Sequence, residues 1–425
     1  MATNVWKGGA ALVAQVDTVT PGGTIAANDI FTITINGKSV SVTATTTTVA
    51  HVTALMTAAF NASEEPEFSE ITASDGTTHV TLTSDTAGVP FTCAATTSPA
   101  VDETFTLLSD GTGASVLNSG PNDAAVVTNW SDGSLPAADD NVVFENSAVS
   151  CLYNLDVTDA LTLTSKSTFT GHIGLPRNNA HGYVEYRATA FNIGTAVTAI
   201  TIGQGDGAGS GRINLDVGAL TAALAITVYK TASRVATDVP SVLLTTGTQS
   251  NDTTLIVNRG DVGVAVNYGE TAVIDALTMG YISQASSDAK VTLGSGVTPL
   301  TTVTKSGGVL VCSSNIITLT NTAGTTTIEG TATLTTGTIS GGTLYYNSSE
   351  TATTLNVAGD ATLDFRQDAR ARIVSNALLY QKGTILDPAK TVTWSAGIDV
   401  IQCGLADVTL DVGEHVTITP SVIGA

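Results

Sequence analysis

A glycine recurs every 17 or 18 residues in the C-terminal half of the chain, at Gly307, Gly324, Gly341 and Gly359. A short run of strand-forming residues follows each of these glycines. A repeat of this length holds only two or three short strands and their turns, so it is one coil of a solenoid rather than a globular unit. Successive coils stack at about 4.8 Å and pair each other's backbone edges. The sequence therefore predicts a rod.

The composition supports a fold built mainly from strands. The 425 residues include 73 Thr and 41 Gly, and only 5% are aromatic. Thr, Val and Ile favour strands because a branched Cβ fits a pleated surface, and glycine supplies the turns. The predicted fold class is mainly β: a small N-terminal α+β domain of ββαβββ order, followed by a parallel β-helix or β-solenoid rod.

The charge limits the classes of partner. The net charge is −21, with 16 Lys and Arg against 37 Asp and Glu. Nucleic acids and anionic membranes are recognised by clustered Lys and Arg, and the chain has no such cluster. We therefore expect no nucleic-acid partner and no membrane partner. The N-terminal residues lack the pattern of a Sec signal, and no apolar run reaches the length of a membrane span.

Four cysteines lie far apart, at Cys93, Cys151, Cys312 and Cys403, with no C-x-x-C pair. Their apolar neighbours favour small buried thiols over disulfides or a metal site. Sparse unpaired cysteines fit a protein that is assembled in a reducing cytoplasm.

Changes in composition divide the chain into four parts. Residues 1–20 are predicted to be an extended N-terminal arm, and residues 21–108 a small α+β docking domain. Residues 109–125 have the composition of a linker. Residues 126–425, where short β runs alternate with turns, are predicted to form the rod. Trp130 is expected to cover the open first coil, because the end of a solenoid needs a cap.

Local patterns define the small domain. Apolar and polar residues alternate over 30–36, and Asn36-Gly37 is a strong signal for a two-residue hairpin turn. Apolar residues at helical spacing predict one helix over about 48–62. Further β runs follow up to residue 108. Around 170–195 the coil pattern breaks, which predicts a longer loop leaving the rod.

Two segments carry a resemblance to known families. The stretch Asp29-Ile-Phe-Thr-Ile-Thr-Ile-Asn-Gly-Lys-Ser-Val, together with the following helix, resembles a small domain of tailed-phage structural proteins and bacterial surface-layer proteins. The stretch from Asn129-Trp130 to Phe144 is similar to the opening of right-handed parallel β-helices in phage fibres and autotransporter-type surface proteins. The resemblance implies a structural role on a virion or cell surface and brings no catalytic residues with it.

Paired carboxylates in a groove would indicate a polysaccharide-degrading spike, because glycosidases use two such groups. The candidate pairs are Asp364 with Asp368, and Glu185 with Asp206. Arginines and tyrosines accompany the first pair. The arginines are Arg366, Arg370 and Arg372. The tyrosines, which could line a sugar groove, are Tyr345, Tyr346 and Tyr380. The alternation of Asp and Arg favours salt bridges, so the chain is not expected to be an enzyme and no catalytic residue is predicted.

Cofactor and metal signals are weak. The glycine-rich stretch from Gly203 to Gly211 lacks the third glycine and the helix of a dinucleotide loop, and its single Asp206 does not match a calcium-binding roll. It is interpreted as a solenoid turn. His172 and His181 could meet across the loop at 170–195, but two ligands make a poor metal site. No cofactor-binding or metal-binding residue is predicted.

The leading hypothesis is a non-enzymatic structural protein of a phage virion exterior, assembled in the host cytoplasm. It would be a capsid decoration or head fibre, or a tail fibre or spike, and would serve stabilisation or host-surface adhesion. Its expected partners are itself as a homotrimer, phage capsid or tail proteins, and host-surface glycans. A bacterial surface-layer or adhesin-type protein is the alternative, and a polysaccharide-degrading tailspike is the third hypothesis.

Overall fold

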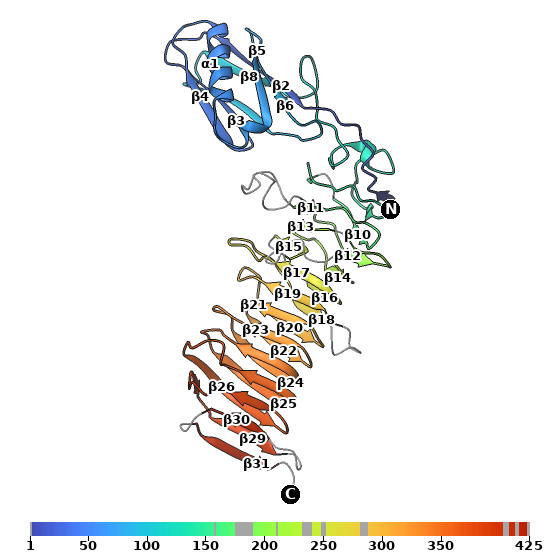
Figure 1. Cartoon of the computed structure of the whole chain (residues 1–425), viewed down its shortest axis with the longest axis vertical. Coiled ribbons are helices and arrows are strands. Elements are labelled where there is room, and N and C mark those ends of the chain that lie inside the picture. Colours follow the sequence, from blue (N-terminus) through green and yellow to red (C-terminus); the bar gives the residue numbers. More distant parts are fainter. Residues whose placement is uncertain are drawn as a thin grey trace.

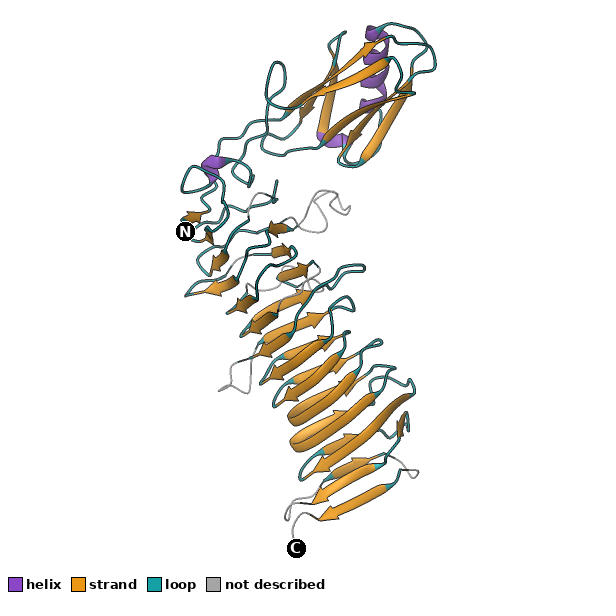
Figure 2. Ribbon diagram, turned by 180° about the vertical axis from the view of Figure 1, so that it is seen from behind, coloured by secondary structure: helices purple, strands orange, loops and turns teal. Residues whose placement is uncertain are grey.

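A long stack of short parallel strands forms most of the molecule, and a small domain lies at one end of it (Figure 1). The structure is a computed structural model that describes residues 2–156, 159–174, 190–209, 211–231, 240–247, 252–280, 288–402, 408–412 and 416–422. The C-terminus lies at the end of the stack opposite the small domain (Figure 2). The chain is thus mostly β, with a long parallel sheet that coils as a solenoid, as the glycine period predicts.

The first ladder of the rod places one strand from each coil beside the strand of the coil before it. Thr302, Thr318, Thr336 and Thr354 follow one another across four coils in register. The strands of this ladder are β1 (Thr3–Val5), β9 (Asn141–Phe144), β10 (Thr162–Lys166), β12 (Ala199–Gln204), β14 (Leu224–Val228), β16 (Thr253–Val257), β18 (Ala276–Met279), β20 (Leu300–Lys305), β22 (Ile316–Asn321), β24 (Leu334–Tyr346), β25 (Ala352–Asp364), β26 (Arg372–Tyr380), β29 (Ile398–Gln402) and β31 (Ile418–Val422).

The second ladder runs parallel to the first and is formed by the alternate strands. Its strands are β11 (Phe191–Ile193), β13 (Ile213–Val217), β15 (Val242–Thr246), β17 (Gly260–Val264), β19 (Ala289–Leu293), β21 (Val309–Cys312), β23 (Thr325–Ile328), β27 (Thr384–Leu386) and β30 (Thr409–Asp411). The long strands β24 and β25 bend and enter both ladders. A further strand, β28 (Val392–Trp394), pairs with the start of β26.

Glycines stack at one corner of the coil, although only partly at the positions that the period indicates. Gly308, Gly324 and Gly342 have φ of +72°, +77° and +72°. A Cβ at each would collide with a backbone oxygen of the coil before it, and this oxygen belongs to Gly308 for Gly324 and to Gly324 for Gly342. Gly307 and Gly341, which the period also marks, do not have positive φ. The corner therefore needs glycine both for its left-handed backbone and for the close approach between coils.

Side chains that point inward form one continuous apolar core along the rod. Leu310, Thr326, Leu344 and Leu363 occupy successive coils at one register position, and all four are buried. Cys151 and Cys312 are buried in this core, as expected, whereas Cys93 in the small domain is only half-buried. Cys403 lies outside the described residues.

A buried polar cluster interrupts this core between β20 and β23. The Lys305 side chain is completely buried, and its Nζ donates to Asn321 Oδ1 (3.1 Å) and to the Ala323 carbonyl (2.6 Å). Thr326 Oγ1 donates to the same Asn321 oxygen (3.0 Å). Burial lowers the pKa of Lys305 to about 8.

The small domain consists of two antiparallel sheets and one helix. Its elements are β2 (Val16–Gly23), β3 (Ile30–Ile35), β4 (Lys38–Thr43), α1 (Val49–Asn61), the 3₁₀ turn η1 (Phe68–Glu70), β5 (Ile71–Asp75), β6 (Val80–Ser84), β7 (Cys93–Ser98) and β8 (Glu103–Leu108). The sheet orders are β5-β6-β2-β8 and β4-β3-β7. Val52, Met56 and Phe60 of α1 pack into the core of this domain. The order differs from the expected ββαβββ by β2 at the start and by a fourth strand after the helix.

The first residues of the chain belong to the rod. Strand β1 pairs in parallel with β9, with Thr3 opposite Asn141, and the Trp6 amide donates to the Val143 carbonyl (2.9 Å). Residues 1–20 are therefore not the separate arm expected from the sequence, because β1 completes the rod and β2 already starts at Val16. The small domain is an insertion between the first two strands of the first ladder.

Aromatic side chains close this end of the rod. Trp6 and Trp130 are 1% and 2% exposed, and their rings meet edge to face at 5.0 Å. Both rings lie 6.1 Å from Phe144 in the first coil. Trp130 thus caps the coil as expected, and Trp6 shares this role.

The connection between rod and small domain is held by hydrogen bonds. Asn129, at the end of the 3₁₀ turn η2 (Val127–Asn129), is fully buried. Its Oδ1 accepts from the Ala10 amide (2.8 Å), and its Nδ2 donates to the carbonyls of Gly120 (2.8 Å) and Asp123 (2.7 Å). Residues 109–125, expected to be a linker, are therefore fastened to the rod at their C-terminal end.

Candidate functional site

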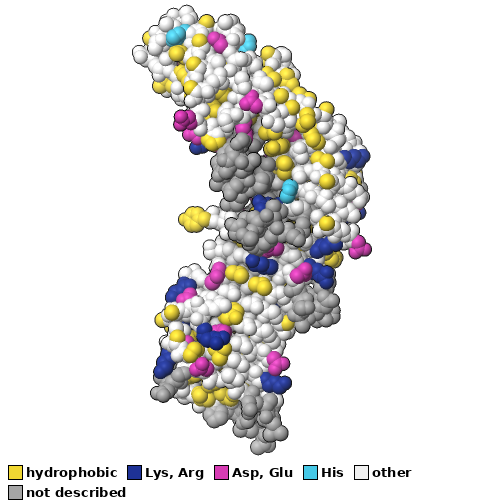
Figure 3. Space-filling view, viewed as in Figure 1, with side chains coloured by type: hydrophobic (Ala, Val, Ile, Leu, Met, Phe, Trp, Pro, Cys, Tyr) yellow, Lys and Arg dark blue, Asp and Glu magenta, His cyan; other side chains and the backbone are white. Residues whose placement is uncertain are grey.

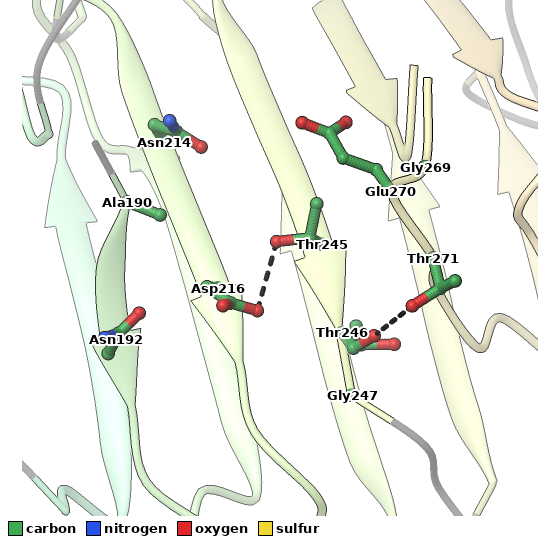
Figure 4. Close-up of a pocket in the computed structure, with 10 residues that line it drawn as sticks. All are labelled: Ala190, Asn192, Asn214, Asp216, Thr245, Thr246, Gly247, Gly269, Glu270 and Thr271. Carbon is green, nitrogen blue, oxygen red and sulfur yellow. Dashed lines mark hydrogen bonds between the residues drawn. The ribbon is translucent and has the colours of Figure 1, made fainter. Parts of the chain in front are cut away.

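A groove lined mainly by polar residues lies on the side of the rod. Its volume is about 510 Å³. Figure 4 shows its walls, which are formed by Ala190, Asn192, Asn214, Asp216, Thr245, Thr246, Gly247, Gly269, Glu270 and Thr271. We call it the side groove. It lies on the outer face of the second ladder, where β11, β13 and β15 are neighbours.

The register of the ladder sets the floor of the side groove. Asn192, Asp216 and Thr245 follow one another across β11, β13 and β15. Because side chains alternate along a strand, the residues on either side of Asp216, Leu215 and Val217, point inward and are buried. The three outward side chains therefore form a polar row, and Thr245 Oγ1 donates to Asp216 Oδ1 (3.1 Å).

A tight turn of the next coil also lines the side groove. The Glu270 amide donates to the Asn267 carbonyl (3.1 Å), and Gly269 has a φ of +79°. The Glu270 carboxylate closes the turn by accepting from the Asn267 amide (3.0 Å) and from Asn267 Nδ2 (2.5 Å). Tyr268 stands on this turn with a relative exposure of 108%, which means that no other part of the chain covers it.

Sequence reasoning did not identify this site. None of its polar residues belongs to a known motif, and they come from coils that are 24 to 29 residues apart, as the pairing of Asn192 with Asp216 and of Asp216 with Thr245 shows. The one local signal was the stretch Asn267-Tyr268-Gly269, whose Asn and Gly favour a tight turn.

The carboxylates at 364 and 368 are occupied by arginines. Arg366 donates from Nε to Asp364 Oδ1 (3.0 Å) and from Nη2 to Asp364 Oδ2 (2.8 Å). Arg370 donates from Nε (2.8 Å) and Nη2 (2.5 Å) to the single oxygen Oδ2 of Asp368. Burial raises the pKa of Asp364, but the bonds and charge of Arg366 outweigh it and hold the pKa below its ordinary value. The bonds from Arg370 lower the pKa of Asp368 to about 2. Both groups are therefore ionised, unlike a general acid, and the salt-bridge interpretation is the one that their geometry supports.

Arg372 anchors this segment in the core. Its guanidinium donates to the carbonyls of Tyr346 (2.6 Å), Asp368 (2.5 Å) and Arg370 (3.0 Å), and its side chain has no exposed surface. Tyr346 is also fully buried, so it cannot line a surface groove beside Tyr345. The tyrosine stripe considered in the sequence is not formed.

Tyr380 lies in a different hollow of about 400 Å³. Its neighbours there are Ala358, Gly359, Gln381 and Lys382. This hollow includes neither member of either candidate carboxylate pair.

The glycine-rich stretch is a turn that packs on neighbouring coils. The Gly209 amide donates to the Ser167 carbonyl (3.0 Å), and Lys230 Nζ donates to the Gly207 carbonyl (2.7 Å). A Cβ on Gly207 would collide with the Ser167 carbonyl, so glycine is needed there for packing. This agrees with the interpretation as a solenoid turn.

The remaining candidates do not assemble into a site that can be described. His172 Nδ1 accepts from the Arg212 amide (2.8 Å), and burial together with the Arg212 charge lowers the pKa of His172. His181 and Glu185, the predicted partners of His172 and Asp206, lie outside the described residues, as does most of the loop expected at 170–195.

The described residues contain neither a metal-binding cluster nor a membrane-spanning helix. Among the residues that the structure describes, no group of three or more His, Cys, Asp and Glu side chains is arranged to hold a metal ion. No helix in the same residues has the length and apolar character needed to cross a membrane. No family model, curated protein or solved structure matches the chain significantly.

Proposed function

We propose that the chain is a non-enzymatic structural protein of a phage virion exterior, either a capsid decoration or head fibre or a tail fibre or spike. The small domain docks on the particle, and the rod projects outward for stabilisation or host-surface adhesion. The observation that carries this proposal is the insertion of the small domain at the capped end of the rod, which leaves the full length of the solenoid extending away from it (Figure 1).

The connection between the small domain and the rod supports separate roles for these two parts. The rod has its own core, which includes Trp6 and Trp130, and the small domain has a separate core around Phe31 and Phe60. Two antiparallel segments connect them, with the Val13 amide donating to the Ser119 carbonyl (2.7 Å). Because the small domain has a separate core and is joined to the rod by only two segments, it can bind a particle without changing the structure of the coils.

The surface near the connection also favours attachment at this end. Large apolar side chains are exposed there, and apolar surface gathers at this end of the molecule (Figure 3). They are Leu12 (62%), Val13 (37%), Val116 (41%), Leu117 (58%) and Val127 (43%). Exposed apolar patches of this kind mark contact sites more often than free surface.

The test removes the small domain without opening the rod. In a variant that replaces residues 14–118 by a short Gly-Ser turn, β1, Trp6 and Asn129 stay in place, because Val13 and Ser119 are bridge partners. A simple fragment 126–425 is less suitable, since it loses β1 and exposes Trp130. Circular dichroism is expected to show the strand signal of a folded rod in the excised variant.

The readout is binding to particles that lack the protein. The full chain is expected to bind them, and the excised variant is expected not to. If the excised variant binds as well as the full chain, the docking surface lies on the rod and the proposed polarity is wrong.

A further inference from the structure

We propose that the side groove binds a neutral oligosaccharide, with Tyr268 stacking on one sugar ring and the polar row binding its hydroxyl groups. This inference rests on the proposed display role, because a rod that projects from a particle can present such a groove to a host surface. It adds a binding site and a ligand class that the display role alone does not specify.

The size of the side groove fits a short saccharide. Its volume of about 510 Å³ lies within the range of small-molecule sites, which is about 300–1,000 Å³. Its floor is part of the parallel ladder, so the groups that line it are held by the backbone pairing of three coils. A ligand would therefore meet a site that is already formed, with little ordering cost.

The polar row offers hydrogen-bonding groups at a regular spacing. Asn192, Asp216 and Thr245 stand on neighbouring strands, which are about 4.8 Å apart in such a ladder. A carboxylate accepts, an amide both donates and accepts, and a hydroxyl does both. Adjacent hydroxyl groups of a sugar ring are themselves donors and acceptors, so this mixed row can satisfy several of them at once. Figure 4 shows Glu270 beside Thr245, on the side away from Asp216.

Tyr268 supplies the apolar part of the site. Its ring is fully exposed on a turn that the Glu270 carboxylate closes and that Gly269 shapes. Tyr268 directly precedes Gly269 and Glu270, which line the side groove, so it is adjacent in sequence to the groove wall. An aromatic ring held on a closed turn can cover the apolar face of a sugar at a small entropy cost, and its hydroxyl group stays in water.

The charge of the site selects among saccharides. Asp216 and Glu270 place two carboxylates in the side groove, and the chain carries a net charge of −21. Uronate, sialate, sulfate and phosphate groups would meet like charges here, which disfavours their binding. The same two carboxylates do not form a metal cluster with a third ligand among the described residues. A neutral, hydroxyl-rich ligand is therefore the class that fits.

The test uses the full-length chain and defined probes. A printed array of neutral and acidic oligosaccharides first identifies a ligand. Saturation-transfer-difference NMR then measures binding of three neutral probes, cellopentaose, maltopentaose and chitopentaose, and of one acidic probe, a hyaluronan tetrasaccharide. At least one neutral probe is expected to bind, and the acidic probe is expected to bind more weakly.

Three variants link that binding to the side groove. Tyr268→Ala is expected to weaken binding by about tenfold, because the stacking surface is lost. Asp216→Ala is expected to weaken it by about threefold to tenfold, because an acceptor is lost. Tyr229→Ala is the matched control, since Tyr229 is an exposed tyrosine (39%) at the end of β14 in the other ladder and should leave binding unchanged.

Several outcomes would overturn the inference. These are the absence of binding across all neutral probes, stronger binding of the acidic probe, or unchanged affinity in Tyr268→Ala. Because Tyr268 is exposed, its loss does not unfold the rod, and thermal melts of each variant verify this. The inference can fail while the display role holds, because particle binding is measured separately with the excised variant.

Discussion

Gly324 and Lys305 meet at a corner of the rod where the coil has little freedom. A Cβ on Gly324 would collide with the Gly308 carbonyl and would lie 2.7 Å from Lys305 Nζ. The Lys305 ammonium group in turn donates to Asn321 Oδ1 and to the Ala323 carbonyl, and both residues lie just before Gly324 in the chain. The left-handed backbone of Gly324, its close packing on the preceding coil and the buried charge of Lys305 therefore depend on one another at this corner.

Replacing Gly324 tests how much the close packing contributes. Gly324→Ala is expected to destabilise the chain by about 3 kcal/mol, because left-handed backbone strain adds to the collision with the preceding coil. Gly330→Ala is the matched control, since Gly330 has a φ of +69° and open space around its Cβ position. The control is expected to cost about 1 kcal/mol for strain alone. Equal losses in urea unfolding would show that the corner is not tightly packed.

Lys305 predicts a pH dependence. The folded pKa of about 8 lies below the unfolded value of 10.5, so the unfolded chain binds more protons between these values. The free energy of unfolding that depends on Lys305 therefore rises as pH increases from about 8 to about 10.5, by up to about 3 kcal/mol.

The variant Lys305→Met isolates this effect from the other titrating groups. The stability of the natural chain relative to Lys305→Met is expected to improve between pH 7 and pH 10. A difference in unfolding free energy that stays constant over this range would contradict the assignment of a buried, charged lysine.

Individual elements differ in how far the sequence could predict them. Helix α1 spans Val49–Asn61, within the range that apolar spacing predicts, and Asn36 and Gly37 have φ of +49° and +88°, as a hairpin turn requires. These signals are local. The glycine period likewise predicts the solenoid, because coils of equal length repeat the same corner.

Contacts between distant segments left no such signal. Strand β1 has only three residues and pairs with β9, which lies 138 residues further along, so nothing in its own sequence marks it as part of the rod. The side groove was missed for a similar reason, since its row depends on the register of coils that are longer than the regular repeat.

The cap that β1 and Trp6 form is expected to stabilise the first coils. Trp6→Ala removes a buried ring that packs on Trp130 and Phe144, which typically costs about 3–5 kcal/mol. Hydrogen exchange is expected to accelerate in β9 and β10 while β3 and β6 keep their protection.

Trp394→Ala provides the control at the far end of the rod. Trp394 packs edge to face on Phe365 at 5.6 Å. Its loss is expected to accelerate exchange in β26 and β28 and to leave β9 unchanged. If Trp6→Ala accelerates exchange in the small domain as much as in β9, the cap is not part of the rod.

At the scale of the whole molecule, the outer faces of the rod favour self-association. Only 12% of the residues are charged, and apolar side chains are exposed along the strands, among them Ile256 (37%), Val309 (39%), Ile317 (46%) and Ile373 (43%). Symmetric packing is the usual way to cover such faces.

We therefore predict a homotrimer of the 43.0 kDa chain. Light scattering coupled to size exclusion at micromolar concentration is expected to give the mass of three chains. A mass of one chain across the concentration range would contradict the prediction. The exposed apolar side chains would then have to be buried against the particle surface instead.

We propose that the small domain docks on the particle and that the rod is displayed. Cryo-electron microscopy of particles that carry the chain can determine this orientation. We expect the density of the two antiparallel sheets and α1 to lie against the particle surface, with the β31 end of the rod farthest from it. Density in which the β31 end contacts the particle while the small domain points into solvent would show that the proposed orientation is wrong.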